Sequence, residues 1–168
     1  MKPDIYWIPG PWPGRLAILA RPRGGDWLSD EVAGWRDAGV QVVVSLLSED
    51  EARELRLSDE ARLLDVSGLK FLSFPIDDYD VPASEGALRQ LVKELQELLE
   101  NGHNVGIHCR AGVGRSSVVA ACLLVDHGED TESSFQRIST ARGLAVPDTV
   151  AQREWVSDFA KLSHEVRH

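Results

Sequence analysis

The sequence has little cysteine and no long apolar run. Cys109 and Cys122 are its two cysteines, too few for the disulfide framework of a small secreted domain, so a reducing setting fits best. The longest uninterrupted apolar run, residues 118–125, is far shorter than the roughly 20 residues that a membrane-spanning helix needs. The first 14 residues contain four prolines and lack the apolar stretch of a secretory signal. We therefore expect a cytoplasmic protein with no membrane partner.

Positive charge is also scarce. Lys and Arg total 18 against 27 Asp and Glu, which gives a formal net charge of −9. This balance argues against a nucleic-acid partner, and it requires that any anionic substrate be bound by a local site. At 168 residues, with no repeat and no linker, the chain suits one hydrophobic core. We expect residues 1–168 to form a single domain and a monomer.

The apolar patterns predict strands that alternate with helices. The expected strands cover residues 5–8, 15–20, 40–47, 69–76 and 104–108. The expected helices cover residues 26–38 after an Asp26 cap, 49–57 after a Ser48 cap with a looser turn to 66, 85–102 after a Ser84 cap, 116–127, 131–142 and 147–163 with Pro147 in the first turn. This alternation predicts an α/β fold, with a central, mostly parallel sheet flanked by helices and ligands at the carboxyl ends of the strands.

The most informative segment lies between the last expected strand and a helix that is apolar nearly all round. A turn from strand to helix can direct successive backbone N–H groups at one point, and the helix N-terminus adds about half a positive charge. Glycines let such a loop curl, and an arginine fork binds two oxygens of a phosphoryl group. The predicted phosphate-binding residues are Arg110, Ala111, Gly112, Val113, Gly114 and Arg115.

The same loop carries a candidate nucleophile. N–H dipoles and the nearby guanidinium of Arg115 favour the thiolate form of Cys109, which is the reactive form of a cysteine. Ser116 can donate its hydroxyl to the sulfur, and His108 can hold the loop through a ring hydrogen bond. We therefore predict that Cys109 attacks phosphorus while Arg115 and the loop amides hold the oxygens.

Residues 108–116 resemble the signature of the protein tyrosine phosphatase superfamily, which is His-Cys, five residues, then Arg and Ser or Thr. The Ala-Gly-x-Gly-Arg-Ser form is most similar to the compact dual-specificity and the bacterial or archaeal tyrosine phosphatases. The resemblance implies the cysteine-phosphatase fold and hydrolysis through a cysteinyl-phosphate. It implies no cofactor and no metal, and the sequence has no metal-ligand spacing.

A second segment, residues 75–82, offers a general acid at the end of an expected strand. Small members of the superfamily carry a similar loop, and on that pattern Asp78 aligns with the residue that protonates the leaving oxygen. Asp77 and Asp80 have similar spacing and remain alternatives. Gln152 resembles the glutamine with which the family positions the hydrolytic water.

These residues predict a phosphatase of phosphorylated proteins, with phosphotyrosine first and phosphoserine or phosphothreonine next. One alternative is a non-protein phosphomonoester, such as an inositol phosphate, a phospholipid head group or a nucleotide. A silent phospho-binding module is a second, but such modules usually lack the nucleophile, the arginine or the acid. A sulfur carrier of the rhodanese type is a third, and the acid loop counts against it.

Several side chains have two interpretations from sequence alone. Cys122 lies in an apolar helix, where core filling competes with a role as redox partner of the nucleophile. Arg21 and Arg23 can border an anion site or lie on the surface. Arg110 can meet substrate charge or point to solvent, and Glu49 can support the site or only begin a helix.

Overall fold

The computed structural model describes residues 2–111 and 113–166, and it contains a five-stranded sheet in the order β1-β2-β5-β3-β4. The strands are β1 (Ile5–Ile8), β2 (Leu16–Leu19), β3 (Val42–Ser45), β4 (Lys70–Ser73) and β5 (Val105–His108). The β1 strand runs antiparallel to β2, and the other neighbouring strands pair in parallel. The predicted α/β fold with a mostly parallel sheet is therefore confirmed.

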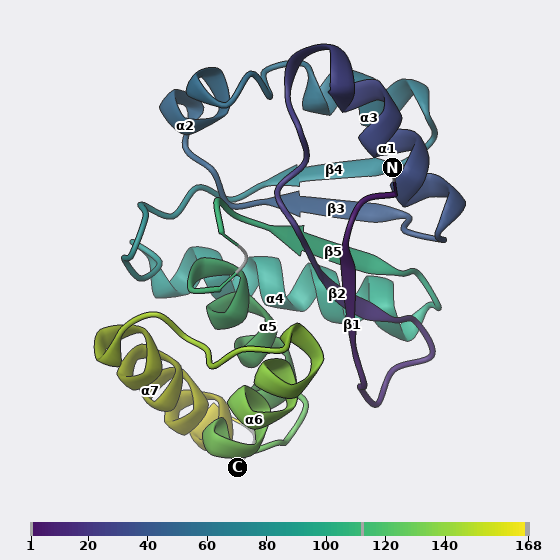
Figure 1. Ribbon diagram of the computed structural model, residues 1–168. Helices are drawn as coiled ribbons and strands as arrows, with labels where there is room; N and C mark the ends of the chain where they lie inside the picture. The colour runs from purple at the N-terminus through teal and green to yellow at the C-terminus, as the bar shows by residue number, and fades with distance from the viewer. Residues whose placement is uncertain (1, 112, 167–168) are drawn as a thin grey trace.

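Helices cover both faces of this sheet (Figure 1). They are α1 (Leu28–Asp37), α2 (Glu49–Glu54), α3 (Glu60–Val66), α4 (Glu85–Glu100), α5 (Arg115–Asp126), α6 (Thr131–Arg142) and α7 (Val150–Val166). One face packs against α1 and α3, the other packs against α4 and α5, and α6 and α7 lie outside α5.

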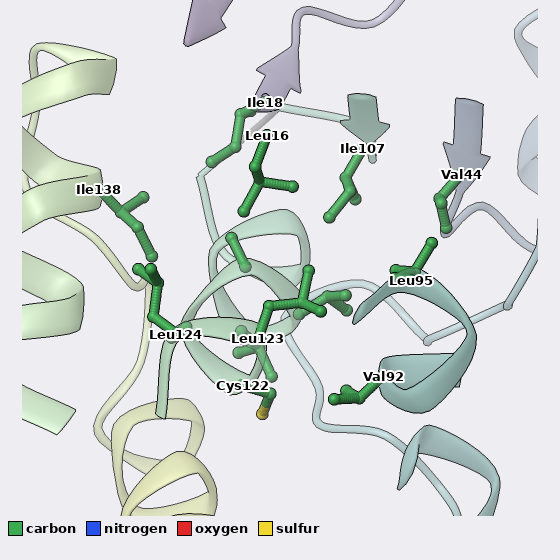
Figure 2. Packing of buried hydrophobic residues seen from close by; sticks show 14 of the residues in the cluster. Leu16, Ile18, Val44, Val92, Leu95, Ile107, Cys122, Leu123, Leu124 and Ile138 are labelled. Atoms are coloured by element: carbon green, nitrogen blue, oxygen red, sulfur yellow. The ribbon is translucent and has the colours of Figure 1, made fainter. Parts of the chain in front are cut away.

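Alternation along the strands divides the core between the two faces. Leu16 and Ile18 of β2 pack on the side of α4 and α5, whereas Ala17 and Leu19 pack on the side of α1. Figure 2 shows the first side, where residues of α4, α5 and α6 converge below the strands. The helix that begins at Arg115, α5, is buried on every side up to its last residue, as its apolar sequence predicts. It therefore forms the centre of the larger cluster.

Two helix starts differ from the expectation. Residues Gly25–Trp27 form a 3₁₀ turn, and α1 begins at Leu28 without a side-chain cap, so the expected Asp26 cap is wrong. The last helix begins at Val150 instead of Pro147, because the Thr149 hydroxyl accepts a hydrogen bond from the backbone N–H of Gln152 and defines the first turn there.

Other boundaries also differ: the strand expected over residues 40–47 is Val42–Ser45, and the helix expected over residues 49–57 ends at Glu54. The strand expected over residues 69–76 ends at Ser73, because Pro75 has no N–H to continue the ladder. The segment still follows β3, since the backbone N–H groups of Phe74 and Ile76 donate to Ser45 and Leu46. The loose turn expected before residue 66 is the regular helix α3.

Gly106 provides a test of packing at the middle of the sheet. A Cβ atom at this position of β5 would lie 2.6–2.8 Å from three side-chain atoms of Leu19, which is fully buried. Gly106→Ala should therefore destabilise the protein by about 1–3 kcal/mol through overpacking.

Gly86→Ala is the matched control, because Gly86 is exposed in α4 and the added methyl would meet only the Ser84 hydroxyl at 3.9 Å. We expect it to be neutral or to stabilise by up to about 1 kcal/mol. Urea unfolding measures both, and equal effects would contradict the packing argument.

Candidate active site

The expected nucleophile lies where the central strand ends. Cys109 follows β5 directly, its side chain is buried, and Gly114 precedes the first residue of α5. The loop between them thus occupies the carboxyl edge of the sheet, where parallel folds bind ligands. Gly112, one of the expected phosphate-binding residues, lies outside the described residues. Ala111 is exposed and Val113 is partly buried.

Arg115 is a buried cation beside this loop. The residue is 2% exposed, and Nη1 donates to Oε1 of Glu51 at 2.7 Å and to the carbonyl of Ile76 at 2.8 Å. Nη2 donates to Oε2 of Glu51 at 3.0 Å and forms an ion pair with Oδ1 of Asp78 at 3.1 Å. Burial acts to lower the pKa of Arg115, but the Glu51 hydrogen bond and the charges of Cys109, Glu51 and Asp78 raise it above its ordinary value. The arginine therefore stays charged.

Glu51 is held in place by the start of its own helix. Ser48 and Glu51 form a capping box, in which the Glu51 N–H donates to the Ser48 hydroxyl and the Ser48 N–H donates to Oε1 of Glu51, both at 3.2 Å. Burial acts to raise the pKa of Glu51, and the hydrogen bonds and charge of Arg115 outweigh it, so the pKa lies below its ordinary value. The carboxylate thus remains charged and clamps the arginine in two places.

The acid loop reaches the same arginine. Asp78 is the acid of this loop that pairs with Arg115, and its side chain is 39% exposed. Asp78 and Asp80 each accept the N–H of the next residue, and all three acids are exposed, so the ion pair with Arg115 is what distinguishes Asp78. The geometry therefore favours Asp78 as the general acid among the three.

The ring of His108 contacts the helices that cover one face of the sheet at the end of β5. Both ring nitrogens are buried. Nε2 lies 2.6 Å from Oε2 of Glu60 in α3, and the Trp35 ring stacks on the His108 ring with the two centroids 5.9 Å apart. The expected ring bond to the loop is wrong for the described residues, where Nδ1 has no hydrogen-bond partner. The ring instead connects β5 to α3 through Glu60.

Gln152 joins the acid loop to the start of α7. Its buried side chain accepts the N–H groups of Asp148 and Thr149 at 3.0 and 3.2 Å, and it donates to the carbonyl of Asp80 at 3.1 Å. Its oxygen is thus occupied by backbone. The carboxylate of Asp148 lies against Gly114, where a Cβ atom would be 2.3 Å from Oδ2. Burial and the charge of Asp78 raise the pKa of Asp148, and Arg115 acts against them.

The remaining candidates lie around this centre. Ser116 is buried, and its hydroxyl has no hydrogen-bond partner among the described residues. Arg110 lies 3.6 Å from a carboxylate oxygen of Glu54 and 4.0 Å from one of Glu51. Arg23 pairs with Glu31 of α1 and stacks over Trp27, which gives it a structural partner.

Cys122 has the surroundings of a core residue. It is fully buried in α5, its sulfur points away from the strands in Figure 2, and burial raises the pKa of its thiol well above the ordinary value. A thiol in this form is a weak nucleophile. These surroundings favour the core-filling interpretation over the redox one.

Three acids of this region were missed by sequence reasoning: Glu51, Glu60 and Asp148. Ser48 with Glu three positions later is a capping-box signature, so the signal for Glu51 was present, whereas Glu49, the acid considered instead, is exposed. Glu60 and Asp148 carry no local signal. In the described part of the chain, no group of three His, Cys, Asp or Glu residues could hold a metal ion, and no helix there is long and apolar enough to cross a membrane.

The sequence of this chain matches a known phosphatase family. Residues 18–129, more than half of the chain, match the family described as polymorphic toxin system, DSP-PTPase phosphatase. Cyclin-dependent kinase inhibitor 3 of Rattus norvegicus is 30% identical over 127 residues, which are 74% of this chain and 59% of that protein. The chain thus spans about three fifths of the length of such relatives.

Solved structures share the fold. A kinase associated phosphatase (KAP) whose catalytic-site cysteine was replaced by serine has a TM-score of 0.88 and 21% identity, and the match covers 98% of this chain and 97% of that one. Tk-PTP in its active form has a TM-score of 0.76 and 25% identity, with 96% and 99% covered. The chain belongs to the dual-specificity phosphatase family of the protein tyrosine phosphatase superfamily.

The Glu51 clamp predicts a pH dependence of stability. Because the pKa of Glu51 is lowered in the folded state, its contribution is present at neutral pH and is lost as the pH falls through the folded-state pKa. Glu51→Gln should cost roughly 1.5–3 kcal/mol at pH 7, the value of a charge-assisted hydrogen bond, and clearly less at pH 3. Urea unfolding at both pH values measures this. Glu54→Gln, at a 65% exposed side chain, is the control and should change little. An equal loss for Glu51→Gln at both pH values would disprove the charge argument.

Proposed function

We propose that this chain is a metal-independent cysteine phosphatase that hydrolyses phosphomonoesters, with phosphotyrosine on proteins as the preferred class and phosphoserine or phosphothreonine next. One observation carries the proposal: the buried guanidinium of Arg115 is clamped by Glu51 beside Cys109 and directs its remaining terminal N–H at Asp78. In this proposal residues 1–168 act as one catalytic domain.

The first step follows from the contacts of Arg115. Glu51 and the Ile76 carbonyl occupy three of the four N–H bonds on its terminal nitrogens, and Asp78 faces the fourth. A phosphoryl group that binds the guanidinium through Nη2 therefore competes with Asp78 for this nitrogen. Its other oxygens meet the backbone amides of residues 110–115 and the N-terminus of α5. Displacement frees the Asp78 carboxyl to face the leaving oxygen.

Chemistry then needs a nucleophile and an acid. The Cys109 thiolate attacks phosphorus, the P–O bond breaks, and Asp78 in its protonated form gives its proton to the leaving alcohol. Ser116 directly follows Arg115, and its hydroxyl has no hydrogen-bond partner among the described residues, which suits it to donate to the sulfur. Water then attacks the cysteinyl-phosphate and releases phosphate and the thiolate.

The surface of the acid loop supports an aryl phosphate on a protein. Tyr79 is 68% exposed beside Asp78 and offers a flat ring to an aryl group. Asp77 and Asp80 are exposed on the same loop and add negative charge near the site. Such charge disfavours a substrate with several phosphates, such as an inositol polyphosphate, and favours a peptide.

Replacement of the nucleophile tests the proposal. Cys109→Ser should reduce hydrolysis of para-nitrophenyl phosphate below detection while binding of phosphate or tungstate persists, because the arginine clamp remains. Steady-state assays in EDTA, with calorimetry for the anion, measure both, and Cys122→Ser is the matched control with turnover close to wild type. Equal turnover by Cys109→Ser and wild type, or loss of turnover in EDTA, would contradict the mechanism. Rates on phosphotyrosine, phosphoserine and phosphothreonine peptides and on a phosphoinositide then rank the substrate classes.

The acid role of Asp78 predicts a dependence on the leaving group. Asp78→Asn should slow kcat/KM for an aryl phosphate with a poorly acidic phenol by about 10²-fold or more, and for para-nitrophenyl phosphate by much less, since a good leaving group needs little protonation. A series of substituted phenyl phosphates measures the slope. Asp77→Asn and Asp80→Asn are the matched controls and should keep the wild-type slope. A steep slope for either control would transfer the acid role to that residue.

A further inference from the structure

A buried carboxylate that the proposed mechanism leaves unused contacts the residue that precedes the nucleophile. Glu60, the first residue of α3, is buried, and its Oε2 lies 2.6 Å from Nε2 of His108, which is also fully buried. The surroundings are apolar, because Trp35 stacks on the ring and the leucines that flank Glu60 in the sequence, Leu57 and Leu64, belong to the cluster on this face. A hydrophobic pair of similar size would serve stability at least as well as a buried polar pair. The contact between Glu60 and His108 therefore calls for an explanation other than stability.

The contacts of the ring determine which nitrogen carries its proton. Among the described residues, Nδ1 of His108 has no hydrogen-bond partner. A proton on Nδ1, in a neutral or in a charged ring, would therefore be a buried donor without an acceptor, which is costly. A proton on Nε2 instead donates to the carboxylate of Glu60. Glu60 thus fixes both the tautomer and the orientation of the ring.

The fixed ring stands at the point where the chain leaves the sheet. His108 is the last residue of β5, it lies opposite Ser45 of β3, and its carbonyl accepts the N–H of Leu46. Cys109 follows directly, beyond the end of the strand. The ring, held between Glu60 and Trp35, is therefore a second anchor for the residue before the nucleophile. In-line attack on phosphorus tolerates little displacement of the sulfur, so such an anchor affects the rate.

We propose, on the basis of the proposed phosphatase function, that Glu60 is a positioning residue of the reaction. It accepts the Nε2 proton of His108, fixes the ring, and so holds Cys109 in line for attack on phosphorus. Glu60 acts through His108 and transfers no proton to the substrate. Because Glu51 holds Arg115 without the help of Glu60, binding of the phosphate itself is independent of this contact.

Glu60→Leu tests this role, with para-nitrophenyl phosphate as substrate and inorganic phosphate as competitive inhibitor. The kcat should fall by about tenfold or more, whereas the inhibition constant of phosphate should stay within about twofold of wild type. Glu60→Gln keeps an oxygen that accepts the Nε2 proton, so its kcat should lie within about threefold of wild type. Asp65→Leu, the same change at an exposed acid of α3, is the control and should leave both constants unchanged.

A second variant covers the case in which Glu60→Leu does not fold. Glu60→Asp keeps the charge but withdraws the acceptor from the ring by one methylene group, and it should also lower kcat while the inhibition constant of phosphate is kept. Nitrogen NMR of the His108 ring adds a measurement that is independent of turnover. The ring proton should reside on Nε2 in the wild type and in Glu60→Gln, and it should be shared between both nitrogens in Glu60→Leu or Glu60→Asp.

Each other outcome decides against the assignment. Wild-type kcat in the Leu and Asp variants, an equal loss in Glu60→Leu and Glu60→Gln, or a loss of kcat matched by weaker inhibition by phosphate would overturn the positioning role. A wild-type ring with its proton on Nδ1 would overturn it as well. A wild type without turnover would refute the phosphatase proposal and the positioning role with it, and a ring proton found on Nε2 would then show that the function, and not the contact, was wrong.

Discussion

A buried arginine is the constraint on which the rest of this structure depends. Transfer of a guanidinium from water into a protein interior costs several kcal/mol unless its N–H groups donate to acceptors there. Glu51 and the Ile76 carbonyl supply those partners from segments that lie 64 and 39 positions from Arg115 in the sequence. The pairing therefore holds the start of α2, the segment after β4 and the start of α5 at one corner of the sheet.

This corner is also where we propose that the chain binds an anion, despite its net charge of −9. The cation is not available to bulk solvent, because it is almost completely buried and its partners are carboxylates. Glu51 orients the fork permanently through its helix cap, whereas Asp78 lies on an exposed loop and holds Nη2 by one contact. In the proposed function a phosphate dianion, which carries more charge than one carboxylate, replaces Asp78 at this nitrogen but does not replace the bidentate Glu51.

The parts of this arrangement that sequence reasoning found are those with a local physical cause. Strand alternation, the Ser84 cap of α4, the apolar α5 and the glycine loop before it each depend on residues within a few positions. The expected start of α1 was wrong because Asp26 lies within a 3₁₀ turn and its side chain caps no helix. Glu60 was missed because its partner, His108, lies 48 positions away, and one acid among 27 has no distinguishing pattern.

The sheet topology, and not a local sequence pattern, brings the acids of the candidate site together. Parallel strands bring the segments after β3, β4 and β5 to one edge, so Glu51, Asp78 and Cys109 meet there although they come from separate loops. Asp148 arrives from a fourth segment, and Gln152 connects that segment to the acid loop through Asp80. Since that same amide also accepts the N–H of Asp148, one buried side chain connects the backbones of the two segments that carry Asp78 and Asp148 at this edge of the sheet.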